Sequence, residues 1–217
     1  MEILSVLVGS RAHGLNTPES DYDYRGVFVN PTRKIVAMEK FRDAKSTSWI
    51  EGDIDQTSYE IGHFLHLASK GNPSILELMV GPVSHVSQLG IELRTMLPYM
   101  VDTQSVVNSF CGYSLNQRKK MFDDHMNRRW KYAVAYLRVL IMGEQLVRTG
   151  TMTLKVPDAW KEYLIDVRDG RVLVGDVINV GISLDAKLRK AAEDSQPRIV
   201  DHEKLNEFLL RVRKENW

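Results

Sequence analysis

The alternation of apolar and polar positions divides the chain into a strand-rich first part and a helical second part. Short, β-branched apolar runs at Ile3–Val8 and Val27–Val29 are bounded by turn residues, a pattern typical of strands. Two further short strands are expected, one near Ile35–Met38 and one near Thr47–Ile50, the latter at the end of a polar loop that begins at Phe41. The first part of the chain therefore predicts a small sheet.

Apolar residues then recur at helical spacing from about Thr57, and Gly71-Asn72-Pro73 ends that pattern. Ser74 is expected to cap a short second helix, with Glu77 as its capping-box partner. From Val83 on, strands become scarce and the spacing becomes helical. Helices are expected over residues 84–96, 105–115, 126–148, 159–166, 177–192 and 202–213.

This change of pattern predicts an α+β chain with a soft domain boundary near Asp102. Residues 1–101 would form the first domain, and residues 102–217 a helical C-terminal domain. A chain of 217 residues is long enough to build one large or two small hydrophobic cores.

The composition is that of an ordinary soluble protein, with 43% hydrophobic and 26% charged residues. A formal net charge of +1 excludes a general polycation, so any contact with nucleic acid must come from a local patch. The single cysteine, Cys111, excludes an internal disulfide and is expected to be a small buried residue in a reducing compartment. Without a membrane-length apolar run or a signal peptide after Met1, we expect a cytoplasmic protein with no membrane contact.

Two aspartates precede the second apolar run. Asp21 and Asp23 stand two positions apart, so in a strand their carboxylates project from the same face. Adjacent carboxylates repel each other unless a cation lies between them or one keeps its proton. A hard, oxygen-seeking cation such as Mg²⁺ is the simplest way to hold such a pair.

The end of the first apolar run carries Gly9 and Ser10. A glycine there lets backbone N–H groups approach an anion, and the serine hydroxyl adds a donor. A phosphate cradle followed by two metal-binding carboxylates on the next strand is typical of phosphoryl or nucleotidyl transfer. The alternative is a solvated hairpin that carries its acidic residues by chance.

Residues 9–15 (GSRAHGL) and 20–27 (SDYDYRGV) resemble the signature of the DNA polymerase beta-type nucleotidyltransferase superfamily. Within it, the match is to the predicted nucleotidyltransferases of the YcgL/RlaP type, found in bacteria and phages and associated with RNA repair. The resemblance implies a nucleotidyltransferase fold with a small mixed sheet flanked by helices. It further implies that Asp21 and Asp23 bind two Mg²⁺ ions, which Mn²⁺ can replace. The nucleotide triphosphate would contact Gly9, Ser10, Arg11 and Ser20.

The superfamily takes a third metal-binding carboxylate from a later strand. Asp55 is the preferred candidate, because the stretch from Asp55 through Tyr59 to Phe64 also resembles the family. Asp53 is its competitor, since the two would share one strand face. Whichever carboxylate does not bind metal would be a solvent-facing acid that caps a helix.

The second half of the chain also resembles the family, so the resemblance covers nearly the whole length of the chain. Residues 129–131 (RWK), Arg138 and residues 143–144 (GE) resemble one family block, and residues 195–209 resemble the C-terminal one. Lys131 and Arg138 stand seven apart on one helix face and are expected to turn toward the triphosphate. Family members often carry a histidine between them, where this chain has Ala135 or Tyr136.

Positive charge gathers between Arg118 and Arg138. Mixed with aromatic residues, it suits a polyanion such as RNA. The alternative, at even weight, is a solvated helix face whose aromatic residues point inward. The basic residues are Arg118, Lys119, Lys120, Arg128, Arg129, Lys131 and Arg138, and the aromatic ones are Phe122, Trp130, Tyr132 and Tyr136.

Three histidines are candidates for binding a metal or a triphosphate. His63 and His66 have a spacing that can bind metal, but with no further ligand near in sequence a packed or surface pair is the preferred interpretation. His13 lies between the phosphate turn and the aspartates, where it would either touch a triphosphate or anchor a loop.

Together these features predict a two-metal nucleotidyltransferase that moves an NMP from an NTP to a hydroxyl, with release of pyrophosphate. The expected acceptor is RNA, either a tRNA or an RNA end. Asp21 and Asp23 would bind both ions, and Asp55 the one beside the attacking hydroxyl. Three alternatives are an antitoxin-like or regulatory nucleotide-binding module, NMP transfer to a protein hydroxyl, and a phosphatase with an Asp nucleophile. The preferred NTP and the oligomeric state are left open.

Overall fold

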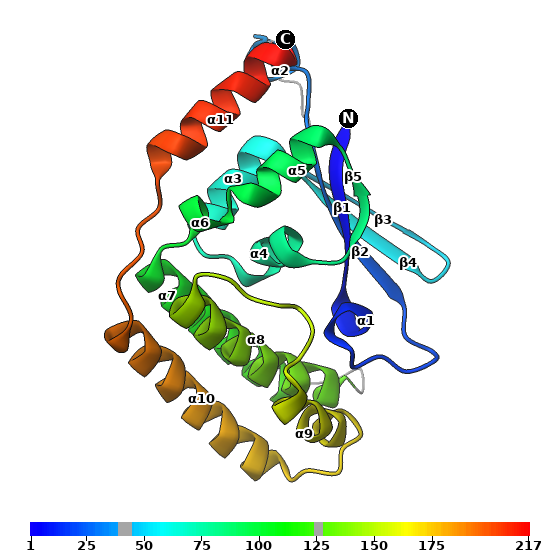
Figure 1. Ribbon diagram of the computed structural model, residues 1–217. Coiled ribbons are helices and arrows are strands. Elements are labelled where there is room, and N and C mark those ends of the chain that lie inside the picture. Colours follow the sequence, from blue (N-terminus) through cyan, green and yellow to red (C-terminus); the bar gives the residue numbers. More distant parts are fainter. Residues whose placement is uncertain (39–44, 124–127) are drawn as a thin grey trace.

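The chain folds into one mixed sheet and a set of helices (Figure 1). The computed structural model describes residues 1–38, 45–123 and 128–217. This α+β architecture, with a helical C-terminal part, confirms the predicted fold class. Within these described residues the sheet has five strands, in the spatial order β3-β4-β2-β1-β5. They are β1 (Glu2–Val8), β2 (Tyr22–Phe28), β3 (Ser46–Glu51), β4 (Ile54–Glu60) and β5 (Val83–Val86).

Strand β2 pairs with β4 in parallel, whereas the other neighbouring strands are antiparallel. The parallel register sets Asp23 opposite Asp55. Helices α3, α4 and α5 cover one face of the sheet (Figure 1). The helices of the first part are α1 (Gly9–His13), α2 (Thr32–Val36), α3 (Ile61–Ser69), α4 (Pro73–Val80), α5 (Gln88–Thr95) and α6 (Leu97–Met100).

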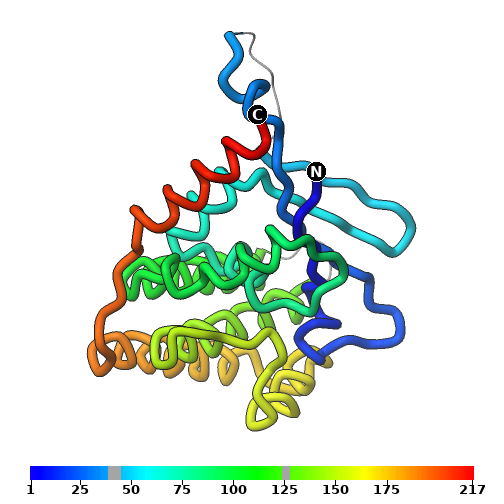
Figure 2. Tube along the Cα trace, turned by 45° about the horizontal axis from the view of Figure 1, so that its top comes forward, coloured from blue at the N-terminus to red at the C-terminus, as the bar shows by residue number. Residues whose placement is uncertain are grey.

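The second part consists of helices. Helix α8 packs against α7, α9 and α10, and α11 returns to lie beside α3 and α6 (Figure 2). The chain end is tied to the start of α2, because the Thr32 N–H donates to the Asn216 carbonyl at 2.7 Å. These helices are α7 (Thr103–Phe122), α8 (Arg129–Thr149), α9 (Asp158–Arg168), α10 (Val174–Asp194) and α11 (His202–Glu215).

One hydrophobic core runs through both parts. Ile3 in β1, Phe64 in α3, Phe110 in α7 and Leu137 in α8 are fully buried members of the same cluster. Cys111 is buried there too, as expected. Helix α7 begins at Thr103, just after the expected boundary, but the division into domains at residues 101 and 102 stays a prediction.

Two predicted elements of the first part are wrong. The segment near Ile35–Met38 is not a strand, because Thr32–Val36 forms helix α2. Helical structure does not start at Thr57 either, because β4 continues to Glu60 and α3 begins at Ile61. The residues of β4 hydrogen-bond to β2 on one side and β3 on the other, and this pairing overrides the local helical spacing.

The start of α4 also differs from the prediction. Asn72 caps this helix, since its side chain accepts a hydrogen bond from the Ile75 N–H at 3.3 Å, and Pro73 occupies the first turn. Ser74 is therefore not the cap, and Glu77 is not a capping partner but a buried residue. A helix over 84–96 is wrong in its first turn, because β5 comes first and Ser87 caps α5.

The remaining predicted elements agree with the structure. Strand β3 contains the expected strand at Thr47–Ile50, and α7, α9, α10 and α11 contain the four helices expected there. Helix α8 begins at Arg129, and the predicted start at Met126 lies outside the described residues, as does the loop from Phe41 to Ala44. No helix in the described ranges has the length and apolarity that crossing a membrane requires.

Candidate active site

A cleft of about 760 Å³ is lined by residues from both halves of the chain. The end of β1, helix α1 and strands β2 and β4 supply one side, and α7, α8 and α9 supply the other. Helix α4 contributes one residue, Glu77. The cleft therefore depends on how the sheet and the helical part are held relative to each other.

Carboxylates line the sheet side of this cleft. Asp23 and Asp55 are register partners on parallel strands, and Asp21 lies directly before β2, where it is exposed. All three line the cleft together with Gly9 and Ser10, whereas Asp53 does not. Asp53 lies at the turn into β4, and its backbone carbonyl accepts a hydrogen bond from the Tyr22 N–H at 2.8 Å. The placement favours Asp55 as the third carboxylate.

The charge of Asp23 is only partly balanced. Burial raises the pKa of this carboxyl, the nearby Asp55 and Asp21 add to the rise, and Lys131 and Arg25 oppose it. A group whose ionised form is disfavoured in this way gains from a cation placed beside it. A cation beside Asp23 would therefore favour the ionised form of this carboxyl.

The glycine at the end of β1 makes room for this carboxylate. Gly9 has a φ of 68°, and a Cβ built on it would lie 1.9 Å from Oδ2 of Asp23. Only glycine allows both the backbone conformation and the close approach. The turn was expected as a phosphate cradle, and the structure adds that it accommodates the Asp23 side chain.

The oxygen-only donor set suits a hard divalent cation. Across residues 1–38, 45–123 and 128–217, however, no three His, Cys, Asp or Glu side chains stand close enough to hold a metal ion together. Two carboxylates in register, with Asp21 just before one of the two strands and room made by Gly9, fit the chemistry of a Mg²⁺ site without forming a closed set of ligands. The assignment of these carboxylates to metal stays a prediction.

Arg11 and Ser20 organise the loop before β2. The Arg11 guanidinium donates to the Ser20 carbonyl through Nη2 at 2.6 Å and lies 3.9 Å from the centre of the Tyr22 ring. The Ser20 hydroxyl accepts from the Thr17 N–H at 2.9 Å. Ser20 lines the cleft and Arg11 does not, so the structure brings Arg11 to the loop and not to the expected nucleotide site.

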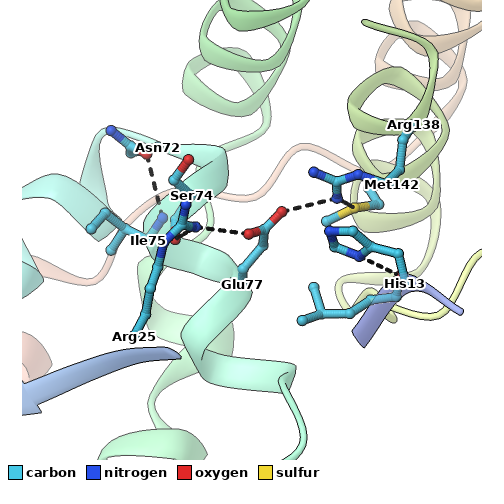
Figure 3. A network of polar contacts seen from close by, with 9 residues as sticks. His13, Arg25, Asn72, Ser74, Ile75, Glu77, Arg138 and Met142 are labelled. Carbon is cyan, nitrogen blue, oxygen red and sulfur yellow. Dashed lines mark hydrogen bonds and ion pairs between the residues drawn. The ribbon is translucent and has the colours of Figure 1, made fainter. Parts of the chain in front are cut away.

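Helix α8 supplies cationic residues to the opposite side. Lys131 and Arg138 both line the cleft, as their spacing predicts. Lys131 is near enough to Asp23 to lower the pKa of that carboxyl, whereas Arg138 is buried and paired with Glu77 at 2.9 Å (Figure 3). Of the two, Lys131 is the one left exposed toward a ligand.

The basic and aromatic region between Arg118 and Arg138 was interpreted either as a site for a polyanion or as a solvated helix face, and its residues fall into both groups. Besides Lys131 and Arg138, four of its residues line the cleft, namely Lys120, Arg128, Trp130 and Tyr132, and the Lys120 ammonium lies 5.8 Å from the centre of the Tyr132 ring. Lys119 is exposed outside the cleft and Tyr136 is buried. Part of the positive charge therefore faces the site, and part faces solvent.

Comparison with known proteins places the chain in a family. Residues 3–212 match the RlaP family model, described as an RNA repair pathway DNA polymerase beta family. The chain belongs to this family. The match spans both the sheet and the helical part, so the whole cleft lies within it.

Two individual proteins are similar to this RlaP-family chain. An uncharacterized 38.9 kDa protein from the nrdC–mobD intergenic region of Enterobacteria phage T4 is 26% identical over 182 residues, which is 78% of this chain and 49% of the phage protein. The chain thus spans about half the length of that relative. A nucleotidyltransferase-like protein from Exiguobacterium sibiricum aligns with 99% of this chain and 74% of its own, at 10% identity and a TM-score of 0.33. With a TM-score this low, the assignment rests on the family match.

The sequence has no histidine between Lys131 and Arg138, and the structure shows where Ala135 and Tyr136 lie instead. Ala135 lines the cleft with a short side chain. Tyr136 is buried and turned to α10, where a Cβ on Gly181 would lie 2.1 Å from its hydroxyl. Of the two residues, only Ala135 therefore faces the cleft.

His13 anchors a loop. Its ring is buried, and Nδ1 donates to the Leu154 carbonyl at 3.0 Å, which ties α1 to the segment after α8. Burial, together with the Arg138 guanidinium, lowers the pKa of His13 to about 3, so the ring is neutral at physiological pH. His63 and His66 lie on α3 away from the cleft, half-buried and exposed, as a surface pair.

Glu77 and Arg25 are two of the cleft residues that the sequence did not predict as site residues. Both line the cleft, and they are joined at 2.8 Å. A charged residue in the middle of the apolar run Ile75–Val80 was the available signal for Glu77, because a buried acid needs a partner. Arg25 lies within the stretch 20–27 that resembles the superfamily signature, but a charged residue in a strand gives no sign of its partner.

Replacing Gly9 with alanine should destabilise the protein and displace the Asp23 carboxylate. We expect a loss of about 2 kcal/mol or more, from the strained φ and the overlap with Oδ2. Gly52→Ala is the matched control, because Gly52 has a φ of 58° but open space around its Cβ position, so it reports the backbone strain alone. Denaturant unfolding measures both. Equal losses in the two variants would contradict the close approach of Asp23 to Gly9.

His13 should make the protein less stable as the pH falls from 6.5. In the unfolded chain His13 is protonated below its ordinary pKa of 6.5, whereas in the folded chain it stays neutral down to about pH 3. Between these two values, lowering the pH therefore favours the unfolded chain. The contribution to the free energy of unfolding is up to about 1.4 kcal/mol per pH unit. His13→Asn, which can still donate to Leu154, should flatten the slope between pH 6 and 5 in denaturant titrations. The exposed control His66→Asn should keep it, and an unchanged slope in His13→Asn would refute this origin.

Proposed function

We propose that this RlaP-family protein is a Mg²⁺-dependent nucleotidyltransferase that moves an NMP from an NTP to a hydroxyl of RNA. The observation that carries the proposal is the pair Asp23 and Asp55, in register on parallel strands and within one cleft with Gly9 and Ser10. Family membership supports the reaction class, and the description of the family as belonging to an RNA repair pathway supports the acceptor.

In this reaction a hydroxyl oxygen of the acceptor forms a bond to the α-phosphorus, and the bond from that phosphorus to the bridging oxygen breaks. Pyrophosphate leaves with the bonding electron pair. Asp55 would accept the proton of the attacking hydroxyl. Gly9 and Ser10 would hold the triphosphate, and Lys131 would balance its negative charge from the other wall.

Asp21, Asp23 and Asp55 would hold two Mg²⁺ ions, which Mn²⁺ can replace. When bound, the ions would lower the pKa of the acceptor hydroxyl and neutralise the charge that develops during in-line displacement. Ser20 would keep the loop that carries Asp21 in place, since its hydroxyl accepts a hydrogen bond from the backbone of Thr17. Arg138, held by Glu77, would act as a fixed part of the wall and not as a mobile ligand.

An Asp-nucleophile phosphatase fits the geometry less well. Such enzymes place their D-x-D residues directly at the end of the first strand, and here Gly9 and Ser10 follow β1. Instead, Asp21 directly precedes β2 and Asp23 is the second residue of that strand. A regulatory module without turnover and transfer to a protein hydroxyl are the alternatives that experiment must separate.

Asp23→Asn should abolish transfer while leaving the fold intact. The change is nearly isosteric and removes a charge that burial disfavours, so metal-free stability should stay level or rise. The assay follows label from each α-labelled NTP into total RNA or lysate protein, with Mg²⁺ or Mn²⁺. Asp53→Asn is the matched control, because Asp53 lies outside the cleft, and it should retain activity. Transfer by Asp23→Asn at the wild-type rate would refute the assignment, and label in protein alone would replace RNA as the acceptor.

RNA should be bound by the cationic residues at the mouth of the cleft. Lys120→Ala combined with Arg128→Ala should weaken RNA binding and flatten the log–log salt dependence by about two units, one for each lost phosphate contact. Lys119→Ala combined with Lys187→Ala removes the same charge outside the cleft and should bind as the wild type does. Filter binding across salt concentrations measures all three proteins. Equal slopes in both double variants would remove the support for an RNA acceptor.

A further inference from the structure

Glu77 is a carboxylate buried within an otherwise apolar helix. Its exposed fraction is 4%, and its neighbours Leu76 and Leu78 on α4 are fully buried. Burial alone would raise the pKa of Glu77, but the Arg138 and Arg25 guanidiniums hold it below its ordinary value, so the residue stays ionised. A buried charge of this kind persists only with partners, and here both partners come from outside the helix.

Each oxygen of this carboxylate holds one arginine (Figure 3). Oε2 accepts from Nη1 of Arg25 at 2.8 Å, and Oε1 accepts from Nη1 of Arg138 at 2.9 Å. Both arginines have a second contact, Arg25 with the Ser74 carbonyl at 2.9 Å and Arg138 with the Met142 sulfur at 2.8 Å. The two guanidiniums are therefore fixed in position and not merely attracted.

The two arginines belong to opposite sides of the cleft. Arg25 follows Asp23 by two residues on β2, so both side chains project from the same face of the sheet. Arg138 follows Lys131 by seven residues on α8, so both lie on one helix face. The single carboxylate of Glu77 thus links the strand that carries Asp23 to the helix that carries Lys131.

Hydrophobic packing alone does not require an acid at this place. An ion pair buried in a core often adds no net stability over apolar residues of similar size, but it does fix the geometry of the groups it joins. The network has two guanidiniums and one carboxylate, and the adjacent His13 is neutral. The group therefore carries a net charge of +1. All four of its residues line the cleft, namely His13, Arg25, Glu77 and Arg138.

We propose that Glu77 is a positioning residue for nucleotidyl transfer, which sets the rotation and distance of α8 relative to β2 and thereby of Lys131 relative to Asp23. This inference rests on the proposed function for its kinetic consequence. Its geometric consequence, a fixed separation of strand and helix, holds whether or not the protein transfers nucleotides.

The test compares two buried glutamate–arginine pairs. Glu60, at the end of β4, pairs with Arg213 of α11 at 2.7 Å and is about as buried as Glu77, but neither member lines the cleft. Glu77→Gln and Glu60→Gln should both lower Tm, since each leaves a buried guanidinium without its carboxylate. At a temperature where both remain folded, Glu77→Gln should lower kcat about 100-fold, because misplaced reacting groups lose rate steeply. The kcat of Glu60→Gln should stay within about twofold of that of the wild type, because this change moves no residue of the cleft.

A distance measurement tests the geometry without activity. Nitroxide labels at Glu51→Cys on β3 and Arg148→Cys on α8 occupy exposed positions, and Cys111 is buried. The distribution of distances between the labels should broaden or shift in Glu77→Gln and stay unchanged in Glu60→Gln. If the wild type transfers no nucleotide but the distances respond as expected, the proposed function fails and the positioning role stands.

A variant that keeps the charge covers the case in which Glu77→Gln does not fold. Glu77→Asp is shorter by one methylene, so one carboxylate cannot reach both guanidiniums from the same backbone position. It should hold Tm near that of the wild type and still lose kcat about 100-fold, with altered label distances. Wild-type kcat per folded molecule and unchanged distances in the Glu77 variants would overturn the proposal.

Discussion

The parallel pairing of β2 with β4 places Asp23 beside Asp55, and the rest of the cleft is arranged around the charge that this pairing creates. Burial and mutual repulsion disfavour the ionised form of Asp23, and the Lys131 ammonium offsets part of that cost from the opposite side. The glycine at the end of β1 is needed for the same reason, since any larger residue at position 9 would occupy the space of the Asp23 carboxylate. A site with unbalanced negative charge beside a backbone turn and a cationic helix is suited to a metal–triphosphate complex.

Such a site works only if its two sides keep their separation. The sheet and the helices share one core, which fixes them coarsely, and the Glu77 carboxylate adds a directed link between a strand and a helix. Van der Waals packing tolerates small rotations of a helix, whereas two charge-assisted hydrogen bonds from one carboxylate do not. In this proposal the buried ion network fixes the position of α8 relative to β2. That role explains why a charged residue occupies a place where an apolar one would pack.

Sequence patterns predicted the parts of this protein that local interactions determine. The long helices of the second part follow from their spacing, and strand alternation accounts for Asp23 within β2 but not for Asp21, which lies just before that strand. Strand β4 was mistaken for the start of a helix because Tyr59, Ile61 and Phe64 also fit helical spacing, and only its partners β2 and β3 make it a strand. The apolar run around Glu77 signals a buried acid that needs partners, but the partners Arg25 and Arg138 could not be predicted, since they lie 52 and 61 residues away in the chain.

The most direct measurement is a crystal structure of the protein with Mg²⁺ and a non-hydrolysable NTP analogue. We expect metal density between the carboxylates of Asp23 and Asp55, and the triphosphate against Gly9 and Ser10. Lys131 should lie within hydrogen-bond distance of a phosphate oxygen, and Arg138 should keep its contact with Glu77. A nucleotide bound outside the cleft, or bound within it with no metal at the aspartates, would refute the proposed function of this cleft.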